Sequence, residues 1–204
     1  MAYSDFTMTE LSKKFGLKEK KAHLFSLQAI TPLPPSESLV RDLEEAALLP
    51  ILSEKAKSEN MIAPILREVW RKSDRQFHFY SGYSFNISEE DKLVGVCDYL
   101  FSTEQSIEIR SIVFCVVEAK NRAIEEGIPQ AFAEMYAAQI FNLRNDKPTP
   151  IIYGCVTNGY DWLFLKLDHQ DAYIDLQRYY SGTNELPILL SILKQIADFY
   201  MKKD

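Results

Sequence analysis

Alternation of apolar and polar residues from Gln76 onward is the sequence feature that most limits how this chain can fold. Side chains of a strand point alternately to the two faces of a sheet, so a period of two predicts half-buried strands. The pattern predicts strands at 76–80, 83–87, 93–101 and 111–119, separated by turn-rich segments. Three more are predicted near 150–156, 160–167 and 172–176, and Thr157-Asn158-Gly159 predicts a hairpin between the first two of these.

Helical patterns precede, interrupt and follow the predicted strands. Thr9 is predicted to cap a short helix over residues 10–15, and the prolines of 31–38 mark a boundary. Apolar spacing and helix-end signals predict four further helices, at 37–49, 55–72, 129–143 and 186–201. This order predicts an α/β fold in which helices flank a mixed β-sheet. Residues 1–35 are interpreted as a helical N-terminal extension with its linker, and residues 36–204 as one domain.

Composition narrows the class of protein. The 204 residues are 47% hydrophobic, yet no apolar run approaches the roughly 20 residues that span a bilayer. The N-terminus lacks the apolar block of a signal peptide, and Cys97, Cys115 and Cys155 lie in strand-like runs without a CxxC pair. We therefore expect a cytoplasmic protein with reduced core thiols and no membrane contact. The net charge of −6 argues against a protein that coats nucleic acid electrostatically, so nucleic-acid binding would require a local basic patch or bound cations.

Charged residues stand inside two otherwise apolar strands. Glu118 and Lys120 end the run 112–119 and, being two apart, point to the same face. Asp98 interrupts LVGVCDYLF, and an antiparallel pairing across a loop near 102–110 would bring it close to Glu118. No arginine adjoins these carboxylates, and two buried carboxylates repel each other, so a cation is the expected partner. In the alternative, Glu118 and Lys120 form a solvated ion pair beyond the sheet, worth less than about 1 kcal/mol.

Two helical residues are further candidates. Glu59 lies three residues before the apolar stripe of Ile62, Leu66 and Val69, which is an unusual place for a carboxylate. Its other explanation is favourable negative charge near a helix N-terminus. Gln130 begins the helix predicted at 129–143, where it is either a functional residue or an ordinary polar residue of the first turn.

The order of these residues resembles that of the PD-(D/E)xK nuclease superfamily. Asp98 comes first, then Glu118-Ala119-Lys120 at a strand end, then the helix near Gln130. The segment SENMIAPILREV resembles the acidic helix of that superfamily, and TNGYDWLFLKL resembles a segment of type I restriction-subunit N-terminal domains and their stand-alone relatives. Cys97 stands where a proline gives the motif its name. The resemblance covers about residues 54–176 and implies a restriction-endonuclease-like fold.

The resemblance also implies a set of ligands for Mg²⁺ or Mn²⁺. Asp98, Glu118 and the backbone carbonyl of Ala119 would bind the ion, because hard oxygen ligands suit it. Glu59 would bind a second ion or orient a neighbour.

The implied activity is hydrolysis of phosphodiester bonds in nucleic acid, DNA rather than RNA. Lys120 would assist the attacking water or stabilise the transition-state charge, and Gln130 would position the lysine or the scissile phosphate. A homodimer would suit an enzyme that cuts both strands. The alternative is a catalytically silent binding or scaffolding module, in which Glu118 and Lys120 are a relict ion pair.

Overall fold

The computed structural model describes residues 2–103, 106, 108–109, 112–121 and 123–201, and within them the strands form one mixed sheet. Its order is β1-β7-β6-β5-β4-β3-β2. The strands are β1 (Lys18–Ala22), β2 (His78–Ser84), β3 (Val96–Ser102), β4 (Val113–Ala119), β5 (Ile151–Thr157), β6 (Asp161–Asp168) and β7 (Asp171–Tyr180). The pairs β1–β7 and β4–β5 are parallel, and the other neighbours are antiparallel. The predicted mixed α/β architecture is confirmed.

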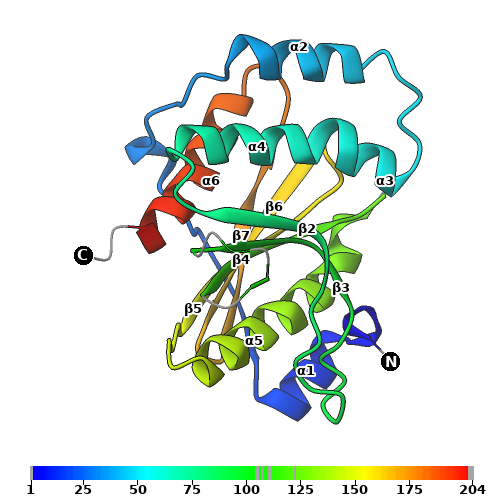
Figure 1. Cartoon of the computed structure of the whole chain (residues 1–204), viewed down its shortest axis with the longest axis vertical. Coiled ribbons are helices and arrows are strands. Elements are labelled where there is room, and N and C mark those ends of the chain that lie inside the picture. Colours follow the sequence, from blue (N-terminus) through cyan, green and yellow to red (C-terminus); the bar gives the residue numbers. More distant parts are fainter. Residues whose placement is uncertain (1, 104–105, 107, 110–111, 122, 202–204) are drawn as a thin grey trace.

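Helices cover both faces of the sheet (Figure 1). On one face lie α1 (Met8–Phe15) and α5 (Ile128–Arg144); on the other lie α4 (Ala63–Lys72) and α6 (Leu186–Met201), with α2 (Glu37–Ala46) outermost. The shorter elements are η1 (Tyr3–Asp5), η2 (Leu27–Ala29), α3 (Glu54–Lys57), the π-helical turn η3 (Ser58–Ile62) and η4 (Ile124–Gly127). A separate hydrophobic core fills each side of the sheet. Over the described ranges, every helix is too short or too polar to cross a bilayer.

Helix α5 lies antiparallel over β4, which determines what surrounds the end of that strand. The amide of the buried Asn142 accepts a hydrogen bond from the Val113 N–H at 2.9 Å and donates one to the Val113 carbonyl at 2.8 Å. These bonds fix the C-terminal end of α5 to the start of β4. The first turns of α5, with Gln130, therefore lie over the opposite end of β4, where Glu118 and Lys120 stand.

The N-terminal residues differ from the predicted helical extension. Strand β1 pairs with β7, so the predicted boundary at residue 35 does not separate the sheet. The sequence of β1, KEKKA, has no apolar alternation because four of its five residues are exposed, and it therefore gave no strand signal. The predicted cap of α1 is also wrong: the Thr7 hydroxyl, not that of Thr9, accepts from the Glu10 N–H in a capping box.

Other predicted boundaries change as well. The two strands expected at 76–80 and 83–87 are the single strand β2, because Gly82, at φ 61°, lets the chain continue without reversing. The helix expected over 37–49 ends at Ala46, and the one expected over 55–72 contains the π-helical turn. The loop expected near 102–110 lies partly outside the described residues.

Two further predictions are confirmed in part. The hairpin across Thr157-Asn158-Gly159 is present, with Gly159 at φ 90° between β5 and β6. Cys97 and Cys155 are buried, as expected of core thiols, whereas the side chain of Cys115 lies outside the described part.

Candidate functional site

Two carboxylates come together from neighbouring antiparallel strands. Tyr99 of β3 pairs with Val117 of β4, so the register places Asp98 opposite Glu118. Residues opposite each other on adjacent strands share one face of a sheet. The charge of Asp98 also raises the pKa of Glu118, as expected of two carboxyl groups that lie close together. The structure thus unites Asp98 and Glu118.

Lys120 joins this pair and connects it to α5. Its Nζ donates to Glu118 Oε1 at 2.6 Å and to Gln130 Oε1 at 3.0 Å. The Glu118 side chain is only 2% exposed and that of Lys120 22% exposed, so this is not a solvated surface pair. Gln130 is therefore more than a polar residue of a first helical turn, because it holds the lysine from the opposite side.

Glu134 is the member of the cluster that sequence reasoning missed. It is fully buried, and its Oε1 accepts a hydrogen bond from Gln130 Nε2 at 3.1 Å. Residues four apart on a helix lie on the same face, which brings Gln130 and Glu134 together. A signal existed in the sequence: Glu134 is the only charged residue in the stretch 130–138, whose other members are mostly apolar.

Burial and mutual repulsion raise the pKa values of the carboxyl groups. The pKa of Glu118 lies well above its usual range because of burial, and then because of the charges of Glu134 and Asp98. Burial likewise raises the pKa of Glu134 and of Asp98, although a hydrogen bond from the Ala119 N–H opposes the rise at Asp98. Burial lowers the pKa of Lys120, but the charge and hydrogen bond of Glu118, together with the charges of Glu54 and Asp98, leave the pKa raised.

The donor set fits a hard cation. Glu118 Oε2 and Glu134 Oε2 are buried and have no hydrogen-bond partner, which is costly for carboxyl oxygens. Asp98 Oδ2 accepts from the Ala119 N–H at 2.8 Å. In the described ranges no three His, Cys, Asp or Glu side chains already form a group that could hold a metal ion. A hard cation beside the unpartnered oxygens would be stabilising, because it would offset the cost of their burial.

Glu59 is not brought to this cluster. Its side chain is 62% exposed and lies 3.8 Å from Lys55, one turn away. The prediction for Glu59 extends the stripe of Ile62 and Leu66 backwards with α-helical spacing, but residues 58–62 form a π-helical turn. A π-helical turn holds extra residues and changes the direction in which earlier side chains point. The prediction that Glu59 reaches the pocket of Asp98 is wrong.

Other residues of the same helical segment approach Lys120 instead. The charge of Glu54, in the first turn of α3, contributes to the raised pKa of Lys120. Lys57 Nζ donates to the backbone carbonyl of Asn121, the residue after Lys120. Helix α3 therefore places one more carboxylate and one more ammonium near the end of β4.

Gly127 allows the chain to pass close to Lys120. A Cβ atom at this position would lie 2.6 Å from Val156 Cγ1 and 3.0 Å from Lys120 Cε. The backbone of Gly127, at φ −84° and ψ −12°, is one that alanine adopts readily. Gly127→Ala should therefore act through contact alone.

We expect Gly127→Ala to lower the free energy of unfolding by about 1–3 kcal/mol, the usual cost of overpacking. It should also displace the Lys120 side chain. The measurement is urea unfolding, together with the crystal structure of the variant. A variant as stable as the parent, with Lys120 unmoved, would contradict this prediction. Gly182→Ala is a matched control, because nothing lies within 4 Å of a Cβ atom there.

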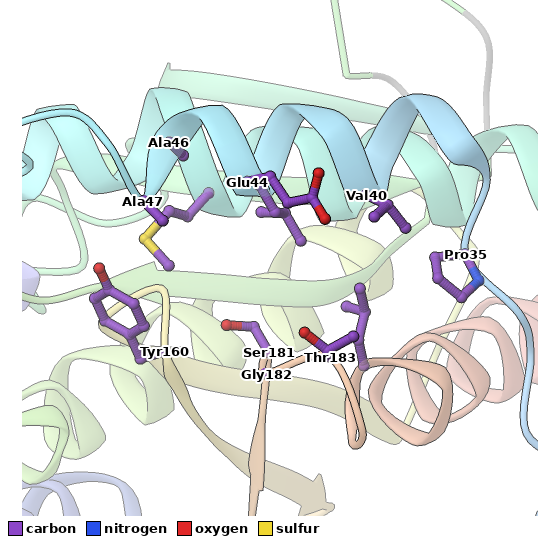
Figure 2. Close-up of a pocket in the computed structure, with 12 residues that line it drawn as sticks. Pro35, Val40, Glu44, Ala46, Ala47, Tyr160, Ser181, Gly182 and Thr183 are labelled. Atoms are coloured by element: carbon purple, nitrogen blue, oxygen red, sulfur yellow. The ribbon is translucent and has the colours of Figure 1, made fainter.

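A separate cavity of about 240 Å³ lies on the other side of the sheet (Figure 2). Figure 2 shows Glu44 of α2, and Ala47 directly after that helix, across from Tyr160, Ser181 and Thr183. The remaining lining residues are Pro35, Val40, Leu43, Ala46, Met61, Gly182 and Leu186. None of the clustered side chains lines this cavity, so the chemistry of the cluster does not depend on it.

In comparisons with known proteins, no family model, no curated protein and no solved structure matches this chain.

Proposed function

We propose that this chain is a Mg²⁺-dependent nuclease of the PD-(D/E)xK superfamily, with a restriction-endonuclease-like fold. The observation that carries the proposal is the meeting of Asp98, Glu118 and Lys120 at one end of β3 and β4. Two carboxylates and a lysine on one face of a sheet, with a glutamine from the next helix, are the groups that the resemblance implies. Their burial argues for a function, because such a cluster costs stability.

Each residue has a role that follows from its surroundings. Asp98 and Glu118 would hold Mg²⁺ or Mn²⁺, with the Ala119 carbonyl as a further ligand. When bound, the ion would neutralise charge on the phosphoryl and leaving oxygens. Lys120 would orient the attacking water, or stabilise the charge of the transition state, from a position shared by Glu118 and Gln130.

The substrate we propose is nucleic acid, DNA rather than RNA. The net charge of −6 means that attraction to phosphate must be local. Lys57 and Lys120 supply positive charge at the end of β4, because Lys57 contacts Asn121 beside Lys120. Two copies of the chain would be needed if both strands of a duplex are cut together.

A second candidate is a catalytically silent binding or scaffolding module. Two observations favour it: the acidic balance of the chain, and the lack, within the described residues, of a ready group of three metal-ligating side chains. In this case Lys120 would serve permanently as the cation that neutralises Glu118.

The experiment that tests the proposal is an assay of the purified protein against labelled DNA and RNA, single- and double-stranded, with Mg²⁺ or Mn²⁺. We expect metal-dependent cleavage of DNA that EDTA abolishes. The Asp98→Asn variant, purified identically, is the control against contaminating nucleases and should lose about 100-fold or more of the activity.

A crystal soaked in Mn²⁺ separates the two candidates further. The nuclease should show the ion between Asp98 and Glu118. Absence of cleavage on every substrate, together with absence of the ion from soaked crystals, would support the silent module.

A further inference from the structure

We propose that Glu134 is a positioning residue that holds the amide of Gln130 in the orientation that presents its oxygen to Lys120. The role in catalysis rests on the nuclease function proposed above, whereas the orientation itself does not. The four side chains form one continuous series of hydrogen bonds, from Glu134 through Gln130 and Lys120 to Glu118.

The ammonium of Lys120 determines which end of the Gln130 amide can face it. An ammonium group has only donors, so Gln130 must offer its carbonyl oxygen, and Oε1 does so at 3.0 Å. The amide nitrogen then points the other way and needs an acceptor. Glu134 Oε1 fills this need at 3.1 Å from Gln130 Nε2.

Burial makes Glu134 hard to replace as that acceptor. It is 0% exposed, so bulk water does not reach its side of the amide. A reversed amide would place NH₂ against the ammonium of Lys120, donor against donor. An acceptor at position 134 therefore selects one of the two amide orientations, and with it the second oxygen that holds Lys120.

The position of Lys120 depends on this second oxygen. Glu118 Oε1 alone would leave the Nζ free to pivot about one contact, while two acceptors from different elements fix it between β4 and α5. Catalytic groups act efficiently only when held close to the productive geometry, so loss of one support should lower the rate without removing the chemistry.

Two substitutions at position 134 distinguish a role of the hydrogen-bond acceptor from a role of the negative charge. Glu134→Gln keeps an acceptor oxygen and removes the negative charge; Glu134→Met keeps a similar length and removes the acceptor. We expect Glu134→Met to lower kcat by about 10-fold or more with little change in KM, and Glu134→Gln to stay within about 3-fold of the parent. Equal losses in both variants would overturn the proposal in favour of a charge or a metal ligand.

A double-mutant cycle tests whether Glu134 acts through Gln130. The Gln130→Met variant should lose as much activity as Glu134→Met, and the double variant no more than either single one. If the activity losses of the two single variants multiply in the double variant, Glu134 acts independently of Gln130 and the proposal is overturned.

The final measurement does not need activity. The Gln130 side-chain amide signal is recorded by ¹H–¹⁵N NMR and assigned by its loss in Gln130→Met. We expect its protons to exchange with solvent at least about 10-fold faster in Glu134→Met than in the parent and in Glu134→Gln. Equal exchange in all three proteins would overturn the proposal, even if the parent cleaves. If exchange is faster in Glu134→Met but the parent does not cleave nucleic acid, the proposed orientation of the Gln130 amide is supported and the proposed nuclease function is rejected.

Discussion

Replacement of Lys120 by methionine is expected to slow phosphodiester cleavage by about 100-fold or more while leaving the fold intact. Methionine keeps the apolar stem that packs at the end of β4 and removes the ammonium that contacts Glu118 and Gln130. A loss of this size is typical of a positioned acid–base or electrostatic group. The measurement is the single-turnover cleavage rate at saturating metal, with thermal unfolding to verify the fold.

Metal and substrate binding should respond differently from the rate. Mn²⁺ binding, measured by calorimetry, should persist or strengthen, because Glu118 loses a competing cation. Substrate affinity should fall only modestly, because one positive charge among many contacts is removed.

Lys166 offers a matched control for this substitution. It lies in β6, its side chain is 24% exposed, and its Nζ is 3.2 Å from Asp168, the same two-residue spacing as Glu118 and Lys120. Lys166→Met should therefore cleave at the parental rate. If Lys120→Met also cleaves at that rate, Lys120 is only an ion-pair partner of Glu118.

Replacement of Glu118 by glutamine is expected to stabilise the metal-free protein while abolishing metal-dependent cleavage. Glu118 is buried beside two other carboxyl groups, and its Oε2 has no hydrogen-bond partner. Glutamine removes the charge and keeps an oxygen for Lys120. We expect a gain on the order of 1–3 kcal/mol in the free energy of unfolding at pH 8 in EDTA, the usual scale of one unsatisfied buried group. Such a gain with loss of function is the expected trade-off at an active site.

The contribution of Glu118 to the free energy of unfolding should depend on pH. The pKa of Glu118 is higher in the folded protein than its ordinary value of 4.5. Proton binding by Glu118 therefore favours the folded state, and this stabilisation is fully present below pH 4.5 and is lost as the pH rises through the folded pKa. The parent should therefore lose stability between pH 5 and pH 8, and Glu118→Gln should lose less. Urea unfolding at both pH values measures this, and parallel curves for the two proteins would contradict it.

Glu68 provides the contrasting control. It is also 2% exposed, but both of its oxygens accept hydrogen bonds from Ser36, from the N–H at 2.8 Å and from the hydroxyl at 2.9 Å. Glu68→Gln would turn an NH₂ group toward one of these donors. We therefore expect this variant to lose about 1–2 kcal/mol, the opposite sign from Glu118→Gln.

The sequence predicts those parts of the site that depend on strand periodicity. Asp98 and Glu118 each stand in an apolar strand, and antiparallel pairing of neighbouring strands is enough to place them together. Gln130 could be associated with them because a helix directly after a strand packs back onto the sheet. These inferences need only local patterns and the order of elements.

The rest depended on features without a local pattern. The prediction for Glu59 relies on the spacing of a regular α-helix, and no pattern in the sequence marks residues 58–62 as a π-helical turn. Glu134 is buried only because α5 lies over the end of β4, which depends on the contact between Asn142 and Val113 at the far end of the helix. Strand β1 is stabilised by its pairing with β7, not by its own composition.

The pairing of β1 with β7 has a consequence for synthesis of the chain. Lys20 and Asp171 form an ion pair across these strands although 151 residues separate them in the sequence. At the usual rates of translation, β1 must wait on the order of ten seconds before its partner exists. During that time it is an unpaired strand, the kind of segment that associates with other chains. Lys18, Lys20 and Lys21 make it a charged one, so the lysines that conceal the strand from sequence analysis also protect the nascent chain from aggregation.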